Sequence, residues 1–135
     1  MRTSLIVILI LLFGSCKQET NSTKTEPVKM GAEGALEHLV FFSLKDSLPT
    51  EDVERFKNLL LTLDRIEGVI EVEVNSRSDV GDSRALNYDL LMVLEFEAIS
   101  YLNTYAEHPY HLEVRDSLMP YLAAPPATFD FEPDQ

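Results

Sequence analysis

The sequence predicts an α+β domain whose four strands and two helical parts follow one another in the order β-α-β-β-α-β. Two segments, 38–45 and 86–97, are apolar on both faces, as the central strands of a sheet are. Two others, 69–75 and 128–132, carry carboxylates on one face, which is typical of solvent-touching edge strands. This order predicts the split β-α-β arrangement, with one four-stranded antiparallel sheet.

The first helix is expected to begin just after Pro49, with Thr50 as its N-cap and acidic side chains in its first turn. Gly68 is placed to end this helix in the left-handed conformation. Between these positions, apolar residues recur at helical spacing and predict one buried stripe. The stripe consists of Val53, Phe56, Leu59, Leu60, Leu63 and Ile66.

The second and third strands are predicted on either side of a polar loop over 76–84. The strand 69–75 alternates and is expected to be half-buried. Its expected inner residues are Ile70, Val72 and Val74, and its outer residues are Val69, Glu71 and Glu73. The segment 86–97 is the longest predicted strand, and its even-numbered residues are all apolar.

A second helix is predicted over 98–107, with Ile99, Leu102 and Tyr105 directed inward. Pro109 disfavours the helical conformation at His108 but suits the first turn of a new helix. We therefore predict a break at this point, followed by a helix that ends near Pro120. That helix carries Leu112, Arg115, Leu118 and Met119.

The faces of the predicted sheet indicate that two copies of the chain associate. If the helices cover one face, Leu39, Phe41, Leu91 and Val93 form an apolar stripe on the other. If these side chains stayed in water, the protein would lose about 1.5–3 kcal/mol of stabilisation for each of them. The predicted monomer has no further element to cover them, so we expect a homodimer that packs sheet to sheet.

Residues 1–16 are typical of a bacterial lipoprotein signal peptide. An apolar run from Leu5 to Phe13 is too short to span a bilayer and ends in Gly14-Ser15-Cys16. This ending resembles a lipobox, although Phe13 stands where a leucine is usual. We expect Cys16 to be acylated, for example with palmitate, and to anchor the protein to a membrane of the cell envelope, facing the periplasm or the exterior. The alternative is an ordinary secretory signal that leaves Cys16 as a free thiol.

Composition limits the remaining chain, in which 17–35 is expected to be a flexible tether and 36–135 a single domain. The chain has 23 Asp and Glu against 11 Lys and Arg, a formal net charge of −12. Such a surface repels nucleic acid and anionic headgroups. Because Cys16 is the only cysteine, the domain has no disulfide framework or thiol nucleophile. We expect no metal and no other cofactor.

The candidate functional residues surround the predicted helix break. His111 is expected in the first turn of the last helix, where its imidazole can take or give a proton near neutral pH. Tyr105 lies one turn before the break and can donate its hydroxyl to an oxyanion. His38 opens the first strand on its helix-facing side. If the three converge, they can abstract a proton α to a carbonyl. The alternative is a pocket or core role without catalysis, and His108 is expected to cap backbone groups.

Five segments occur in the order and spacing of a known family: 38–42, 66–69, 88–97, 105–111 with its His-Pro-x-His element, and 129–131. Over nearly all of 36–133 the chain resembles the stress-responsive A/B barrel domain family. The resemblance implies a ferredoxin-like monomer that pairs into a dimeric α+β barrel.

One plant member of that family is a polyketide cyclase that works without a metal or organic cofactor. By the resemblance, its catalytic tyrosine and histidine correspond to Tyr105 and His111, and a further pocket histidine corresponds to His38. Where that enzyme has a fourth pocket histidine, this chain has Leu90, two residues after Tyr88.

Two functions follow from these residues. The favoured one is a membrane-anchored stress-response domain that binds a small apolar ligand without catalysis. The ligand-binding residues are expected to be Val40, Phe42, Tyr88, Leu90 and His108. The alternative is a cofactor-free cyclase or lyase that acts on a small carbonyl compound. In that case His111 is the base, Tyr105 the oxyanion donor and His38 the third catalytic residue.

Overall fold

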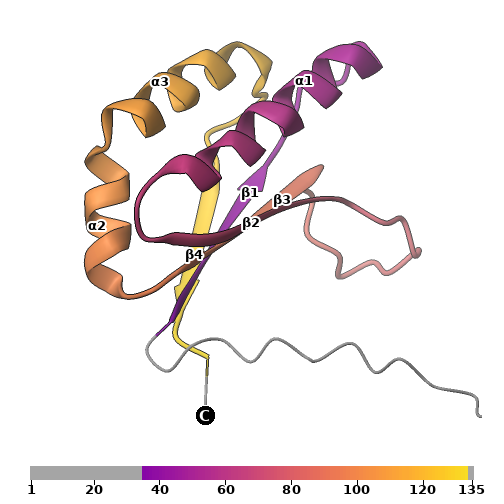
Figure 1. The fold of residues 1–135 in the computed structure, drawn as a ribbon. Coiled ribbons are helices and arrows are strands. Elements are labelled where there is room, and N and C mark those ends of the chain that lie inside the picture. Colours follow the sequence, from indigo (N-terminus) through magenta and orange to yellow (C-terminus); the bar gives the residue numbers. More distant parts are fainter. Residues whose placement is uncertain (1–34, 134–135) are drawn as a thin grey trace, which may run out of the picture.

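The structure is a computed structural model that describes residues 35–133. Its strands form one antiparallel sheet in the order β2-β3-β1-β4, so the two strands predicted to be central are central. The helices lie together on one face of this sheet (Figure 1). The elements are β1 (Leu36–Phe42), α1 (Thr50–Leu61), β2 (Val69–Ser76), β3 (Leu90–Phe96), α2 (Ile99–Glu107), α3 (Pro109–Leu118) and β4 (Ala127–Phe131), with 3₁₀ turns at η1 (Thr62–Arg65) and η2 (Met119–Tyr121).

The hydrophobic core lies between the sheet and the helices. Phe56 of α1 is fully buried and meets Phe42 of β1 edge to face, with ring centroids 5.3 Å apart. On the other side, Phe96 of β3 packs against Tyr105 of α2 at 5.2 Å. Each such side chain contributes about 1.5–3 kcal/mol on burial, and aromatic pairs of this geometry add about 0.5–1.5 kcal/mol. The core therefore holds all three helices on the same face of the sheet. Within residues 35–133, no helix is long and apolar enough to cross a membrane.

The two ends of the first helix differ from the prediction. Pro49, not Thr50, is the N-cap, and its carbonyl accepts from the backbone N–H groups of Asp52 and Val53 at 3.0 and 3.2 Å. Thr50 is already helical, because the extended conformation of the proline places the turn one residue earlier. At the other end, α1 tightens into η1, and Ile66 is extended. Gly68 is left-handed, with φ +87°, but it turns the chain into β2 instead of capping the α-helix.

A bulge in β2 reverses the predicted burial of Ile70. Val69 pairs with Phe96 and Glu71 with Glu95, so Ile70 is the extra residue on its strand. It is 44% exposed, while Val69 joins Val72 and Val74 against the core. Without the bulge, strict alternation along β2 would have placed Ile70 on the core face with Val72 and Val74, and Val69 on the other face. The prediction of Ile70 as an inner residue was therefore wrong.

The third strand is shorter than predicted because the chain leaves the sheet before Leu90. Asp89 fixes this point: its carboxylate accepts from the Leu44 N–H at 2.7 Å, and its own N–H donates to the Phe42 carbonyl at 2.8 Å. Leu86 lies beyond it, in the loop that projects from the sheet, and is 62% exposed. Ile99 is also exposed, at 58%, and Tyr101 packs against the core from α2 in its place.

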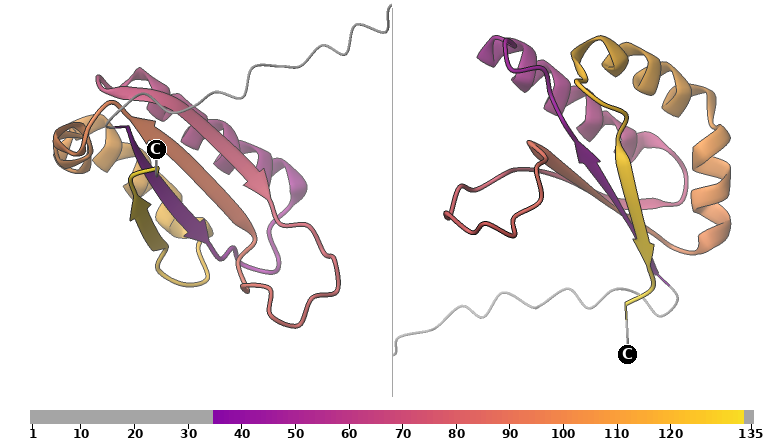
Figure 2. Two further views of the ribbon diagram at one scale, coloured as in Figure 1. Left: turned by 90° about the horizontal axis from the view of Figure 1, so that it is seen from below. Right: turned by 180° about the vertical axis from the view of Figure 1, so that it is seen from behind.

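The face of the sheet away from the helices is apolar at its centre, as predicted. Leu39, Phe41, Leu91 and Val93 are half-buried there, and among the described elements no helix covers them (Figure 2). On β4, the large side chain of Phe129 continues this surface and lies directly opposite Leu39. We call these five residues the open-face stripe.

An acidic row borders the open-face stripe. Glu37, Glu95 and Glu71 are in register across β1, β3 and β2, and with Glu73 and Val93 they line a shallow depression. Partial burial raises the pKa of Glu37, and the charges of Glu95, Glu73 and Glu71 raise it further. Like charges directly opposite on neighbouring strands are destabilising. Lower pH therefore relieves repulsion on this face.

Candidate functional site

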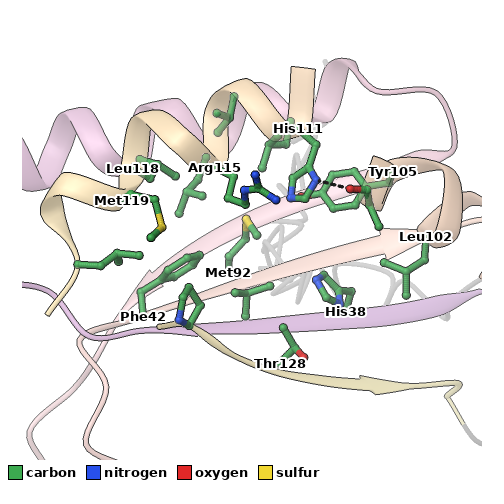
Figure 3. Close-up of a pocket in the computed structure, with 17 residues that line it drawn as sticks. His38, Phe42, Met92, Leu102, Tyr105, His111, Arg115, Leu118, Met119 and Thr128 are labelled. Carbon is green, nitrogen blue, oxygen red and sulfur yellow. Dashed lines mark hydrogen bonds between the residues drawn. The ribbon is translucent and has the colours of Figure 1, made fainter. Parts of the chain in front are cut away.

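An apolar cavity of about 320 Å³ lies between the sheet and the α2–α3 pair (Figure 3). Its floor is β1, β3 and β4, and its other walls come from α1, α2, α3 and the segment that leads to β4. The polar side chains in its lining are His38, Tyr105, His111, Arg115 and Thr128. The volume is near the lower end of the roughly 300–1,000 Å³ that small-molecule sites occupy.

The break between α2 and α3 places Tyr105 and His111 side by side. His108 is extended, with ψ 129°, because Pro109 follows it, and its imidazole Nδ1 accepts from the Tyr110 N–H at 3.2 Å. This confirms the predicted capping role of His108. The change of direction brings the last turn of α2 against the first turn of α3. The rings of Tyr105 and His111 stack there, with centroids 4.3 Å apart and planes 29° from parallel.

Tyr105 is held by its ring and keeps its proton. The side chain is 2% exposed and packs edge-on against Phe96 and His38, whose ring centroids are 5.2 and 6.4 Å away. Burial raises the pKa of its phenol well above the ordinary value, because the charged phenolate is disfavoured in an apolar environment. The hydroxyl is therefore a hydrogen-bond donor at neutral pH.

His111 is positioned as a neutral base. Its Nδ1 lies 3.2 Å from the carbonyl oxygen of Ala106, which can only accept, so Nδ1 carries the hydrogen and Nε2 is left as an acceptor. Burial lowers the pKa of His111, and the positive charge of Arg115 lowers it further. The imidazole is consequently neutral at pH 7.

His38 reaches the same cavity from β1. It pairs with Asp130 of β4 in the sheet register, and its Nδ1 forms a short contact with the Asp130 carboxylate. The carboxylate can only accept, so Nδ1 of His38 carries the hydrogen of this contact. The structure thus brings together all three predicted catalytic residues, His38, Tyr105 and His111, in the wall of one cavity.

The predicted ligand-binding residues divide into two groups. Val40 and Phe42 line the cavity. Tyr88 instead lies near the open face, with its ring 5.3 Å from that of Phe41. Leu90 is buried in the core, 3% exposed, and is not part of the cavity lining. His108 caps α3 and borders a separate depression on the outside of the α2–α3 junction. Contrary to the expected ligand-binding site, none of these three residues belongs to the cavity lining.

Sequence reasoning missed two polar residues of the site. Asp130 and Arg115 were predicted as parts of a closing strand and a helix, with no site role. The β1–β4 register decides that Asp130 faces His38, and the sequence of one strand does not show which residue of the neighbouring strand lies opposite. For Arg115 there was a signal, since it lies four residues after His111 and helical residues at this spacing share a face. Cys16 and the segments 1–16 and 17–34 lie outside the described residues.

A family model described as Stress responsive A/B Barrel Domain matches residues 36–133. No curated protein matches the chain. A solved dabb family protein from Mesorhizobium loti, with a ferredoxin-like fold, is 26% identical and has a TM-score of 0.63; the match covers 76% of this chain and all 100% of that one.

Two further solved structures have the same fold. A dimeric ferredoxin-like protein of unknown function from Bacteroides fragilis is 23% identical, with a TM-score of 0.58 over 74% of this chain and 97% of that one. A hydroxynitrile lyase from Passiflora edulis is 16% identical, with a TM-score of 0.63 over 74% of this chain and 94% of that one. The ferredoxin-like α+β fold is therefore shared with proteins that form dimers.

Proposed function

Because the chain belongs to the stress-responsive A/B barrel domain family, we propose that its domain is a homodimeric ligand-binding module that takes a small apolar molecule into the cavity beneath α3. The observation that carries the proposal is the cavity lining. Apart from five polar side chains it consists of apolar groups from β1, β3, the helical elements and the segment that leads to β4. An apolar molecule that fills this space removes its own apolar surface and that of the cavity wall from water, which contributes about 25 cal/mol of binding free energy per Å² buried.

The methyl ketone 2-decanone is a probe of suitable chemistry, and Val40→Phe is the variant that fills the cavity. Val40 is buried and lines the floor, so the larger ring occupies space that the ketone needs. We expect wild-type protein to bind 2-decanone and Val40→Phe to bind it at least tenfold more weakly in a calorimetric titration. Val80→Phe, in the exposed loop, is the matched control and should bind like wild type. Equal binding by both variants and wild type would contradict the proposal.

The second candidate function is cofactor-free proton transfer at a carbonyl compound, and the geometry of His111 favours it. Nε2 of His111 would take a proton from the carbon α to the carbonyl, and the Tyr105 hydroxyl would donate to the enolate oxygen. Return of a solvent deuteron restores the ketone with deuterium at that carbon. A solved protein from Passiflora edulis with the same fold is a hydroxynitrile lyase, so this fold can carry an active site, although the fold alone does not specify the reaction.

Deuterium exchange into 2-decanone separates the two functions. If the site transfers protons, His111→Gln should slow the exchange about 10²–10⁴-fold, and Tyr105→Phe, which keeps the ring, about 10²–10³-fold. Because the pKa of His111 is below its ordinary value of 6.5, the base form persists as the solution becomes mildly acidic. The exchange rate should therefore hold as the pH is lowered to 6.5 and fall only in more acidic solution. If the protein binds 2-decanone but deuterium enters the ketone no faster than in buffer alone, the domain binds its ligand without catalysis.

We also propose that the module is attached to a membrane of the bacterial envelope through acylated Cys16. The apolar run that closes in Gly14-Ser15-Cys16 supports this attachment. One acyl chain gives only marginal membrane binding, so a lipoprotein-type anchor needs more than one. Labelling of expressing bacteria with a tagged palmitate checks the proposal. Wild type should take up the label and Cys16→Ser should not; an unlabelled wild type would contradict it.

A further inference from the structure

Arg115 is the one permanently charged side chain in the cavity lining as the structure describes it. It lies in the last turn of α3, four residues after His111, so the two side chains project from the same face of the helix. Figure 3 shows the Arg115 guanidinium directed toward the cavity beneath α3, beside the His111 ring. A permanent cation is unusual here, because most of the wall is apolar and the chain as a whole carries a net charge of −12.

The guanidinium of Arg115 retains capacity for another acceptor. Its Nε and one terminal nitrogen both donate to a single oxygen of Asp116, at 3.0 and 2.8 Å. The other terminal nitrogen has no hydrogen-bond partner within residues 35–133. The side chains of Arg115 and Asp116 are 54% and 68% exposed, and surface ion pairs of this kind contribute only about 0–1 kcal/mol. A ligand carboxylate can therefore bind without breaking a strong interaction.

We infer that the cavity selects an amphipathic carboxylate, whose apolar body fills the space beneath α3 and whose carboxylate is bound by Arg115. The inference rests on the proposed function and adds the chemical class of the ligand. The planar guanidinium forms paired hydrogen bonds with a carboxylate, which a neutral ketone or amide cannot match. Because His111 beside it is neutral, it adds no positive charge of its own, and the attraction of the carboxylate depends on Arg115. The apolar walls of the cavity receive the hydrocarbon chain.

Decanoate and decanamide test the inference, since they have the same hydrocarbon chain and differ in charge. At pH 7.5 we expect wild-type protein to bind decanoate at least tenfold more tightly than decanamide in calorimetric titrations. Arg115→Gln should remove this preference, because it weakens decanoate binding much more than decanamide binding. Arg115→Lys should restore part of it, because the charge remains but the paired geometry is lost. Asp116→Asn keeps the guanidinium and frees it, so it should bind decanoate as well as wild type or better.

The outcomes distinguish the inference from the function on which it rests. If wild type binds decanamide and 2-decanone but shows no preference for decanoate, the selection by Arg115 is wrong and the apolar binding site stands. The same holds if Arg115→Gln keeps the preference, since the arginine then only covers the cavity mouth with its aliphatic stem. If none of the three probes binds, the ligand-binding function itself is wrong.

Discussion

Replacing Gly68 with alanine is expected to destabilise the domain by about 3 kcal/mol, through two separate effects. At φ +87° an L-residue pays about 1–2 kcal/mol for the left-handed conformation. The added Cβ would also lie 2.0 Å from Cδ1, 2.2 Å from Cγ and 2.6 Å from Cβ of Tyr101. Overpacking of this kind typically costs about 1–3 kcal/mol. Rotation of the tyrosine cannot relieve the overlap, because its own Cβ is involved, so α2 must move.

Gly81→Ala is the matched control for this substitution. Gly81 has φ +70° and nothing within 4 Å of an added Cβ, so its replacement carries the conformational cost alone. In urea denaturation, the free energy of unfolding should therefore fall further for Gly68→Ala than for Gly81→Ala. Because α2 carries Tyr105, a displaced α2 should also weaken binding of 2-decanone, whereas Gly81→Ala should leave it unchanged. Equal loss of stability in the two variants would show that Tyr101 adjusts without cost.

Replacing Leu39 with glutamate is expected to dissociate the proposed dimer while leaving the monomer folded. Leu39 lies in the middle of the open-face stripe, in register with Val93 on one side and Phe129 on the other. In a sheet-to-sheet dimer this position is enclosed, and an unpaired buried charge costs several kcal/mol. We expect the dissociation constant to rise at least a hundredfold, which corresponds to about 2.8 kcal/mol. Sedimentation velocity at micromolar concentration measures it.

Ile99→Glu provides the control for the dimer experiment. Ile99 is an exposed apolar residue at the start of α2, on the helical side of the molecule, so the same substitution there should leave the dimer intact. All variants are compared at pH 7.5, because protonation of the acidic row around Glu37 would favour association and mask the effect. A wild-type protein that sediments as a monomer under these conditions would contradict the dimer. So would a Leu39→Glu variant that remains dimeric.

Several features of the fold were predictable because they depend on local sequence. The apolar character of both faces of β1 and β3 identified the two central strands, which the sheet order confirms. Pro109 identified the break between α2 and α3, since proline restricts the residue before it whatever its surroundings. The alternation of side chains between the two faces of β1 and β3 also predicted four of the five residues of the open-face stripe, all but Phe129. Each of these signals lies within a few residues of the feature that it predicts.

The errors arose where a distant contact overrides the local pattern. Ile70 fits the alternation of an inner residue, but the bulge against β3 leaves it exposed. Leu86 fits the pattern of β3, but Asp89 bonds to Leu44 and Phe42 and ends the strand before it reaches that residue. Tyr88 was assigned to the pocket and lies near the open face. In each case the deciding partner is tens of residues away in the chain or on another strand.

By itself, the sequence determined the order of the elements, the helix break, the apolar face left open and the acidic charge, since these follow from which residues are neighbours in the chain. Only the tertiary structure decided that Asp130 faces His38, that Tyr105 and His111 stack, and that Arg115 lines the cavity. These contacts depend on strand register and on the angle between two helices. Both are set by the packing of the whole core, because a one-residue slip of a strand would turn all its buried side chains to the opposite face of the sheet.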